Sequence, residues 1–202
     1  MRMLISSIQT TFIKGRKLLN RVLVLNEIVD LAKRSKRIYV LLKVDFEKAY
    51  DCMDWTFLKK TIVEMGFGAQ WIKWMEETIM NSYLSVLING SPTQDFKVSE
   101  GLRQGDPLSS FLFSMVGEVL KLLVKRVVDA ELLKDFKINN RVSYNILQYA
   151  VNTIIICDGA RHNLWALKLI LKGYGIISGL KINIGKTSLF GIGVEDGYLN
   201  AT

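Results

Sequence analysis

The sequence predicts an α+β fold in which antiparallel strands alternate with amphipathic helices. Apolar residues recur at helical spacing in several segments, and short runs rich in β-branched residues lie between them. Two pairs of these runs are spaced as hairpins, which pair their strands antiparallel. Half of the 202 residues are hydrophobic, which is enough to bury a core and argues against intrinsic disorder.

The first half of the chain is expected to hold three helices, one buried strand and one hairpin. The apolar run IYVLLKVDF fits a buried strand that ends at Asp45. Asp54 is a good N-cap for the helix that follows, and Asn89-Gly90 is a favoured pair for a hairpin turn. In order, we expect a helix over 17–33, the strand over 38–46, a helix over 54–65 closed by Gly66, a helix marked by Trp71, Trp74, Met75 and Ile79, and a hairpin of 83–88 with 96–98.

The second half is expected to begin with a glycine-flanked loop over 101–105. Pro107 suits the first position of a long helix that runs to about Val128. A hairpin, a helix and a last strand should follow. The expected bounds are 146–149 with 153–157 for the hairpin, with Val151-Asn152 at its tip, 163–177 for the helix and 181–184 for the strand; the inner face of the long helix should carry Leu112, Met115, Val119, Leu122 and Leu123.

The chain is basic, with 27 Lys and Arg against 19 Asp and Glu and a net charge of +8. The stretch 14–48 holds ten basic and four acidic residues, so it carries +6 of this charge. Such a surface attracts a phosphate-rich partner, with an affinity that falls as salt rises. A solvated helix face is the alternative, and charge alone does not decide between them.

The composition excludes several classes of protein. With Cys52 and Cys157 as the only cysteines and His162 as the only histidine, a disulfide scaffold, a Cys/His zinc site and a His-based triad are excluded. The two thiols are interpreted as small buried hydrophobes, and the four tryptophans as core residues rather than base-stacking platforms.

We expect an intracellular protein without a membrane partner. No run of about 18 apolar residues and no signal peptide is present in the sequence. The basic run 33–37 matches a nuclear localisation patch in composition, which would make the protein nuclear; a solvated loop is the commoner explanation.

Two motifs contain candidate catalytic or ligand-binding residues. In KVDFEKAYD, residues 43–51, Asp45 stands at the end of a buried strand, where sheets expose functional side chains, although an Asp there more often caps the next helix. In GLRQGDPLS, residues 101–109, the glycines let backbone approach a ligand, while Arg103 and Gln104 offer donors to phosphate or base edges. Alone, the second motif is also compatible with a structural turn.

In this order and spacing, the motifs resemble those of reverse transcriptases from non-LTR (LINE-type) retrotransposons. The resemblance covers residues 9–190. The segment around FIKGR, 12–16, resembles the fingers motif, 43–51 motif A, and 101–113 motif B; 147–150 opens motif C, and 179–183 with Lys186 is similar to motif D. The resemblance divides the chain into a partial fingers region, 1–37, and a right-hand polymerase palm, 38–202, in which helices flank an antiparallel sheet.

The resemblance implies a polymerase that copies an RNA template into DNA from a DNA primer, using deoxynucleotide triphosphates and two Mg²⁺ ions. Asp45 matches the catalytic metal ligand of motif A, and Tyr50 matches the aromatic that excludes a ribose 2′-hydroxyl. The remaining positions that the resemblance singles out are Arg103, Gln104 and Gly105 at the nucleotide, Lys14 and Arg16 at the nucleic acid, and Lys186, or as runner-up Lys181, as the proton donor to the leaving pyrophosphate.

Motif C departs from the family pattern. The family reads aromatic-Ala-Asp-Asp there, and this chain reads Tyr149-Ala150-Val151-Asn152. Valine cannot ligate a metal, and asparagine offers one neutral oxygen, so the carboxylates fall from three to one. A loss of about 4 kcal/mol of transition-state stabilisation already costs about a thousandfold in rate. The other nearby acids are not placed to substitute; these are Glu47, Asp51, Asp54 and Asp158.

We therefore expect a polymerase-like fold with little or no polymerase activity. The alternative is a non-catalytic remnant that binds RNA or DNA through the basic Lys14–Arg37 face. Relative to the family pattern, the chain begins inside the fingers and ends shortly after motif D. We expect such a chain to expose apolar surface and therefore to be poorly soluble or to self-associate.

Overall fold

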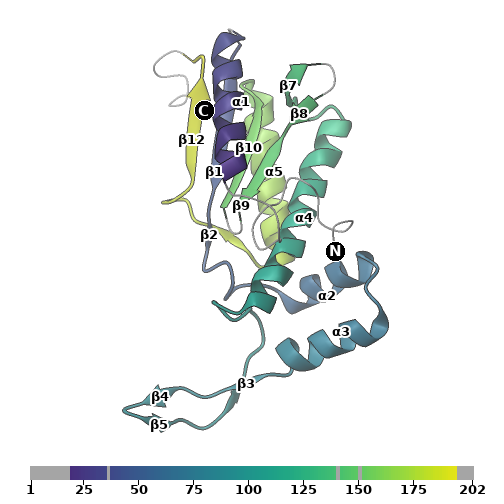
Figure 1. Cartoon of the computed structure of the whole chain (residues 1–202), viewed down its shortest axis with the longest axis vertical. Coiled ribbons are helices and arrows are strands. Elements are labelled where there is room, and N and C mark those ends of the chain that lie inside the picture. Colours follow the sequence, from purple (N-terminus) through teal and green to yellow (C-terminus); the bar gives the residue numbers. More distant parts are fainter. Residues whose placement is uncertain (1–18, 36, 140–141, 150–151, 195–202) are drawn as a thin grey trace.

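The fold is built on a four-stranded antiparallel sheet in the order β12-β1-β10-β9 (Figure 1). The computed structural model describes residues 19–35, 37–139, 142–149 and 152–194. The strands of the sheet are β1 (Tyr39–Val44), β9 (Ile146–Tyr149), β10 (Asn152–Asp158) and β12 (Ser188–Ile192). This arrangement confirms the predicted α+β class and the predicted buried strand.

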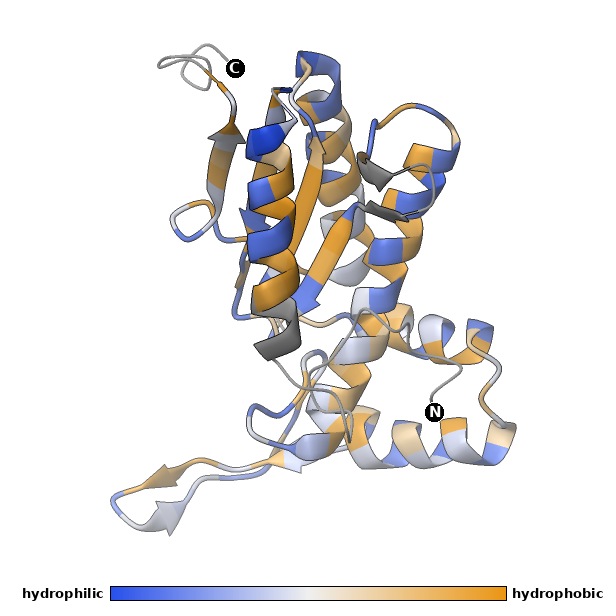
Figure 2. Cartoon of the chain, turned by 45° about the horizontal axis from the view of Figure 1, so that its top comes forward, coloured by the Kyte–Doolittle hydropathy of each residue, from blue (hydrophilic) through white to orange (hydrophobic). Residues whose placement is uncertain are grey.

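Helices cover both faces of the sheet (Figures 1 and 2). On one face, α1 (Leu19–Arg34) packs Ile28 and Ala32 against the side chains of Tyr39 and Leu41 and their neighbours. On the other face, α4 (Pro107–Asp129) and α5 (Arg161–Ser178) pack against Val40, Val44 and their neighbours. Because successive strand residues point to opposite faces, burial on both sides requires a run of apolar residues, and β1 has one over residues 39–42, before the exposed Lys43.

The expected helix after motif A is present as α2 (Trp55–Glu64). Its N-cap is Asp54, whose Oδ1 accepts a hydrogen bond from Phe57 N at 2.6 Å, and Gly66 follows its end with φ of 79°. The next helix, α3 (Ala69–Met75), continues directly into a π-helical turn, η1 (Glu76–Met80).

The predicted hairpin around Asn89-Gly90 is also confirmed. β3 (Tyr83–Leu84) pairs with β6 (Phe96–Lys97), and nearer the turn β4 (Leu87–Ile88) pairs with β5 (Ser91–Pro92). Asn89 and Gly90 both have positive φ, at 51° and 84°, as a two-residue turn of the favoured type requires.

The long helix α4 lies in the core. Asp106 caps it, with Oδ1 accepting from Leu108 N at 2.9 Å, and Pro107 begins it as predicted. By length and composition alone α4 is apolar enough to cross a bilayer, but 56% of its most apolar window is buried inside the protein. The prediction that Leu122 faces inward is wrong, because this side chain is 54% exposed. The fully buried positions Leu112, Val116, Leu120 and Val124 recur every four residues, and Leu122 lies off this row.

The C-terminal half contains the predicted hairpin β9–β10, the helix α5 and a short strand β11 (Lys181–Ile182), which pairs with β2 (Phe46–Glu47). Three strands were not predicted: β7 (Phe136–Asn139), β8 (Val142–Tyr144) and the sheet edge β12. The pattern of β12, SLFGI, is short and only half-buried, so it lacks the continuous apolar signal of β1.

The prediction that the tryptophans are core residues is only partly right. Trp55 and Trp71 are half-buried, whereas Trp74 and Trp165 are 56% and 62% exposed. Helical spacing identified the helix but not which of its faces turns inward.

Matched glycine substitutions in α5 should separate a required backbone conformation from ordinary helix propensity. Gly179 ends α5 with φ of 78°, and a Cβ there would collide with the Cys52 carbonyl oxygen. Gly173 lies inside the same helix with open space around it. We expect Gly179→Ala to lower the free energy of unfolding by about 2–4 kcal/mol and Gly173→Ala to raise it by up to about 1 kcal/mol. Urea unfolding measures both; equal effects would contradict the structure.

The two thiols should differ sharply in reactivity. Cys157 is fully buried in the core, and burial, with a smaller contribution from the Asp158 carboxylate, raises its pKa to about 12. Cys52 is half-buried. At pH 8 only about one Cys157 in ten thousand is thiolate, so a thiol reagent should label Cys52 first and Cys157 only on unfolding. The Cys52→Ala variant checks that the fast labelling phase belongs to Cys52, because this phase should disappear in it. Fast labelling that persists in this variant would contradict the burial of Cys157.

Candidate functional site

Asp45 lies at the end of β1, where backbone hydrogen bonds hold it from two directions. Its carbonyl oxygen accepts from Asn183 N at 2.9 Å, and its N–H donates to Thr187 Oγ1 at 3.3 Å. The loop 183–187 therefore brackets the residue that matches motif A. The Thr187 N–H donates in turn to the Asn183 carbonyl oxygen at 2.8 Å, which closes the loop on itself.

The strand register brings motif C to the same end of the sheet. β1 and β10 pair antiparallel, with Val44 opposite Thr153. One further step in this register sets Asp45 opposite Asn152, the first residue of β10. Asn152 pairs with Tyr149 across the β9–β10 turn, so it flanks the tip of the hairpin rather than forming it. Val151 lies outside the described residues.

Three other acids that the motif C change leaves as candidate metal ligands lie on other elements of the fold. Asp54 caps α2, and Asp158 pairs with Tyr39 at the far end of β1. Glu47 belongs to β2, where its backbone lies opposite that of Lys181 in the β2–β11 ribbon. Within the described residues, no group of three or more His, Cys, Asp or Glu side chains is arranged to hold a metal ion. The donor set at this end of the sheet does not fit a pair of divalent ions, which needs several carboxylate oxygens.

Backbone hydrogen bonds join motif B to the turn that follows motif A. Leu102 N donates to the Tyr50 carbonyl oxygen at 2.7 Å, and Gly101 N donates to that of Met53 at 2.8 Å. Trp55 Nε1 donates to the Gly101 carbonyl oxygen at 2.6 Å. Gly101 has φ of 92°, and a Cβ there would lie 2.6 Å from the Asp51 carbonyl oxygen. This close approach is the physical reason for the first glycine of the motif.

Tyr50 is half-buried between motif A and α4. Its ring centroid lies 5.1 Å from that of Phe113, and its hydroxyl donates to Ser110 Oγ at 3.4 Å. The side chain of Tyr50 is therefore fixed by packing and by one hydrogen bond, both to the first turns of α4.

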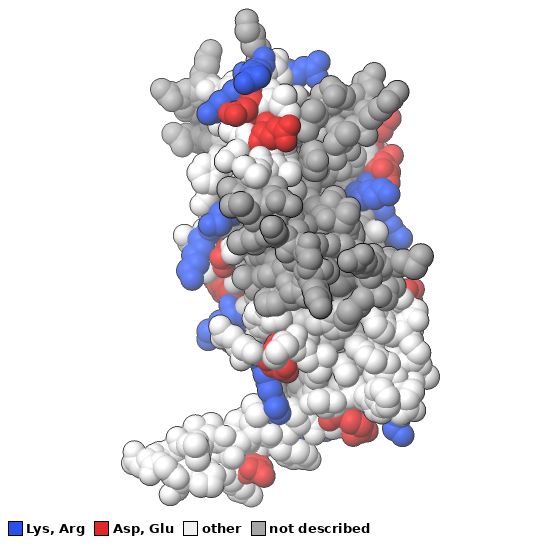
Figure 3. Space-filling model, viewed as in Figure 1, with Lys and Arg blue, Asp and Glu red and all other residues white. Residues whose placement is uncertain are grey.

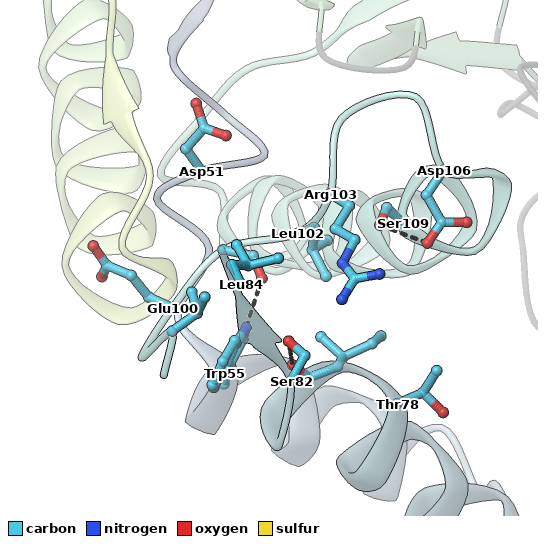
Figure 4. Close-up of a pocket in the computed structure, with 13 residues that line it drawn as sticks. Asp51, Trp55, Thr78, Ser82, Leu84, Glu100, Leu102, Arg103, Asp106 and Ser109 are labelled. Carbon is cyan, nitrogen blue, oxygen red and sulfur yellow. Dashed lines mark hydrogen bonds between the residues drawn. The ribbon is translucent and has the colours of Figure 1, made fainter. Parts of the chain in front are cut away.

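Arg103, Gln104 and Gly105 form an exposed loop before α4, and Gly105 has φ of 87°. Arg103 also lines a cavity of about 230 Å³ between this loop and the segment 78–84. Figure 4 shows its guanidinium directed into that space toward Thr78 and Ser82. Asp51, Glu100 and Asp106 also line this cavity, but Figure 4 shows the carboxylates of Asp51 and Glu100 directed away from the guanidinium, and the Asp106 carboxylate caps α4. The guanidinium offers several N–H donors to a ligand in this cavity.

The two lysine candidates of motif D lie on different elements. Lys186 is exposed in the loop that brackets Asp45, and its N–H donates to the Asn183 carbonyl oxygen at 3.2 Å. Lys181 is exposed in β11. Lys14 and Arg16 lie outside the described residues.

Parts of the predicted basic stretch lie on the protein surface. Five of its basic residues are exposed: Lys33, Arg34, Arg37, Lys43 and Lys48. On the face drawn in Figure 3, Lys and Arg lie mainly along the margins of the molecule, interspersed with a few acidic side chains.

Three residues of the site were not predicted. Trp55 was interpreted as a core residue, but its indole holds the motif B loop in place. Asn183 and Thr187 hold the backbone of Asp45. The sequence marked Thr187 only as the residue that follows Lys186. Its hydrogen bond with Asp45 joins residues that are 142 positions apart, and such a contact leaves no local pattern in the sequence.

Sequence comparison matches residues 1–194 to the family described as reverse transcriptase (RNA-dependent DNA polymerase). A 149 kDa protein of transposon TX1 from Xenopus laevis is 28% identical over 127 residues, which is 63% of this chain and 10% of that protein. The Pol polyprotein of the type-2 retrotransposable element R2DM from Drosophila melanogaster is 25% identical over 169 residues, 82% of this chain and 15% of that protein. The chain thus spans a small part of these relatives.

Solved structures support the same fold. Apo telomerase from Candida tropicalis superposes with a TM-score of 0.65 at 17% identity, covering 91% of this chain and 36% of that one. Telomerase from Candida albicans, solved with a fragment of telomeric RNA, gives a TM-score of 0.64 at 14% identity over 86% of this chain and 30% of that one. The sheet with its flanking helices is therefore a polymerase palm, and the chain belongs to the reverse transcriptase family as a domain related to the Pol proteins of non-LTR retrotransposons.

Proposed function

We propose that this domain has lost the nucleotidyl-transfer activity of its family while keeping the palm. The observation that carries the proposal is the β1–β10 register, which ends with Val44 opposite Thr153 and so brings the next residues, Asp45 and Asn152, to the same end of the sheet. Stabilising the attacking 3′-oxygen and the triphosphate requires two divalent ions on clustered carboxylates. A neutral amide opposite a lone carboxylate supplies too little negative charge to hold two ions close together.

Mg²⁺ is our proposal for the ion of the ancestral site, with Asp45 as its remaining ligand. Reverse transcriptases of this family use divalent metal ions. Hard carboxylate oxygens suit Mg²⁺. Asn152 and Val151 occupy the positions where the family pattern places the other two carboxylates.

The proposed partners are an RNA template, a DNA primer and deoxynucleotide triphosphates. Tyr50 is held rigidly against α4, as a residue that excludes a 2′-hydroxyl by contact needs to be. Gln104 and Gly105 are exposed in the motif B loop, whose Gly101 and Leu102 are hydrogen-bonded to the motif A turn. The exposed Arg103 guanidinium offers donors to a phosphate or a base edge of the nucleotide. Lys186, on the loop that brackets Asp45, is the proposed proton donor of the ancestral reaction.

The second candidate function is nucleic-acid binding without catalysis, through the basic Lys14–Arg37 face. The exposed side chains of Lys33, Arg34 and Arg37 favour it. Such a contact would be electrostatic and largely independent of sequence.

We also propose the division into partial fingers, 1–37, and palm, 38–202. On this division α1 belongs to the fingers segment and anchors it, because Ile28 and Ala32 are buried against the sheet. An intracellular location is our proposal, with the run 33–37 as the segment that would direct the protein to the nucleus.

Primer extension tests the loss of activity. On a primed RNA template with Mg²⁺ or Mn²⁺, we expect the unaltered chain to extend no more primer than Asp45→Ala. The variant with both Val151→Asp and Asn152→Asp should gain about a thousandfold in rate over the unaltered chain. Adding Asp45→Ala to that restored variant should abolish the gain. Extension by the unaltered chain above the Asp45→Ala level would overturn the proposal, and no gain on restoration would show that motif C is not the only defect.

RNA binding tests the second candidate. We expect the affinity for single-stranded RNA to fall steeply with salt and to vary little with sequence. Replacing Lys14, Arg16, Lys33 and Arg34 by Ala should flatten the salt dependence by roughly 0.7 in log–log slope for each lost phosphate contact. The control replaces four other basic residues of α4 and α5, Lys125, Arg126, Lys168 and Lys172, and changes the net charge equally. Two results would contradict binding through this face. One is an RNA affinity that does not change with salt, and the other is an equal change of the salt dependence in both variants.

A further inference from the structure

The hairpin formed by the strands β3, β4, β5 and β6 is apolar, and its large side chains are exposed. Figures 1 and 2 show it projecting away from the body of the protein. Its exposed large side chains are Tyr83 at 62%, Leu84 at 38%, Val86 at 51%, Leu87 at 70%, Ile88 at 59% and Phe96 at 47%. Successive strand residues point to opposite faces, so Val86, Leu87 and Ile88 make both faces apolar. An isolated two-stranded ribbon is marginally stable in water, and a third strand would stabilise it.

The two outer edges of the hairpin differ. Val86 N donates to Thr93 Oγ1 at 2.9 Å, and Thr93 N donates to the Val86 carbonyl oxygen at 2.8 Å, so the backbone of Val86 faces into the hairpin. Its neighbour Leu87 is opposite Pro92. By the alternation of the ladder, Leu87 turns its N–H and C=O outward.

The first strand is therefore open to pairing, and the second is not. Residues 83–88 contain no proline and no charge. On the second strand, Pro92 has no N–H to offer at the outer edge, and the polar residues Thr93, Gln94 and Asp95 follow it. Proline and charge are the devices that keep an edge strand from pairing.

Charge restricts the partner. The chain carries +8, so two copies repel each other over most of their surface. Residues 83–97 hold only Asp95 and Lys97, which balance, and Figure 3 shows the hairpin almost free of charged side chains. A nucleic acid would gain nothing there. A neutral apolar strand fits, and the segment YLSVLI of a second copy is such a strand.

We propose that Tyr83–Ile88 pairs antiparallel with the same strand of a second copy, so that two hairpins form one four-stranded ribbon in a symmetric dimer. The contact is self-complementary, because an antiparallel pair of identical strands is related by a two-fold axis. The blocked second strand limits assembly to two copies. The projecting hairpin keeps the two positively charged bodies apart. The dimer is independent of polymerase chemistry.

Sedimentation of the full 202-residue chain, treated with nuclease, tests the proposal. Over about a hundredfold range of concentration we expect a monomer–dimer equilibrium that tightens at high salt, because salt screens the repulsion between copies. Leu87→Lys should raise the dimer Kd by at least about tenfold. Leu169→Lys on α5 is the matched control, since Leu169 is 68% exposed and the added charge is the same; its Kd should stay near that of the unaltered chain.

Three outcomes would overturn the proposal. The first is a monomer at every concentration, and the second is an equal response of both lysine variants. The third is association that nuclease or high salt abolishes, which would mean that nucleic acid bridges the copies. Growth into assemblies larger than dimers would show that the second strand of the hairpin also pairs, contrary to the proposal.

Discussion

The register of β1 on β10 is the constraint on which this structure depends. A shift of β1 by one residue would turn Val40 and Val44 from the α4–α5 side of the sheet to the α1 side. Both faces are buried, so such a slip is costly on both sides. The register that sets Asp45 opposite Asn152 is therefore fixed by apolar packing and not by the residues of the site. A palm of this kind can lose its carboxylates and keep its geometry.

The loops around the site are likewise positioned by contacts that do not involve the side chains of the site. The motif B loop is joined to the motif A turn through backbone groups of Tyr50, Gly101 and Leu102, and motif D is joined to Asp45 through Asn183. Backbone hydrogen bonds do not depend on which side chains surround them, except where space allows only glycine, as at Gly101 and Gly179. This explains why motifs A, B and D lie together although motif C has changed. The stability of the fold and the chemistry of the site rest on different atoms.

The β3–β6 hairpin is the exception to an otherwise well-covered architecture. Its turn is determined locally by Asn89 and Gly90, which adopt the required positive φ. Its strands gain little from the rest of the described chain, since most of their large side chains remain exposed. An element that is specified by local sequence and left unburied by the tertiary fold is available to a partner.

By itself the sequence determined every element with a strong local signal. These were the buried strand before Asp45, the capped helix after Asp54, the Asn89-Gly90 turn and the helix that begins at Pro107. It also determined the chemistry of motif C, because a valine and an asparagine cannot act as carboxylates in any fold. Only the tertiary structure decided which helix face turns inward, as Leu122 and Trp165 show, and where the edge strand β12 lies. It alone placed Thr187 against Asp45 and brought Asn152 to the same end of the sheet, because hydrogen bonds and strand pairs between distant segments follow from packing and leave no periodic trace in the sequence.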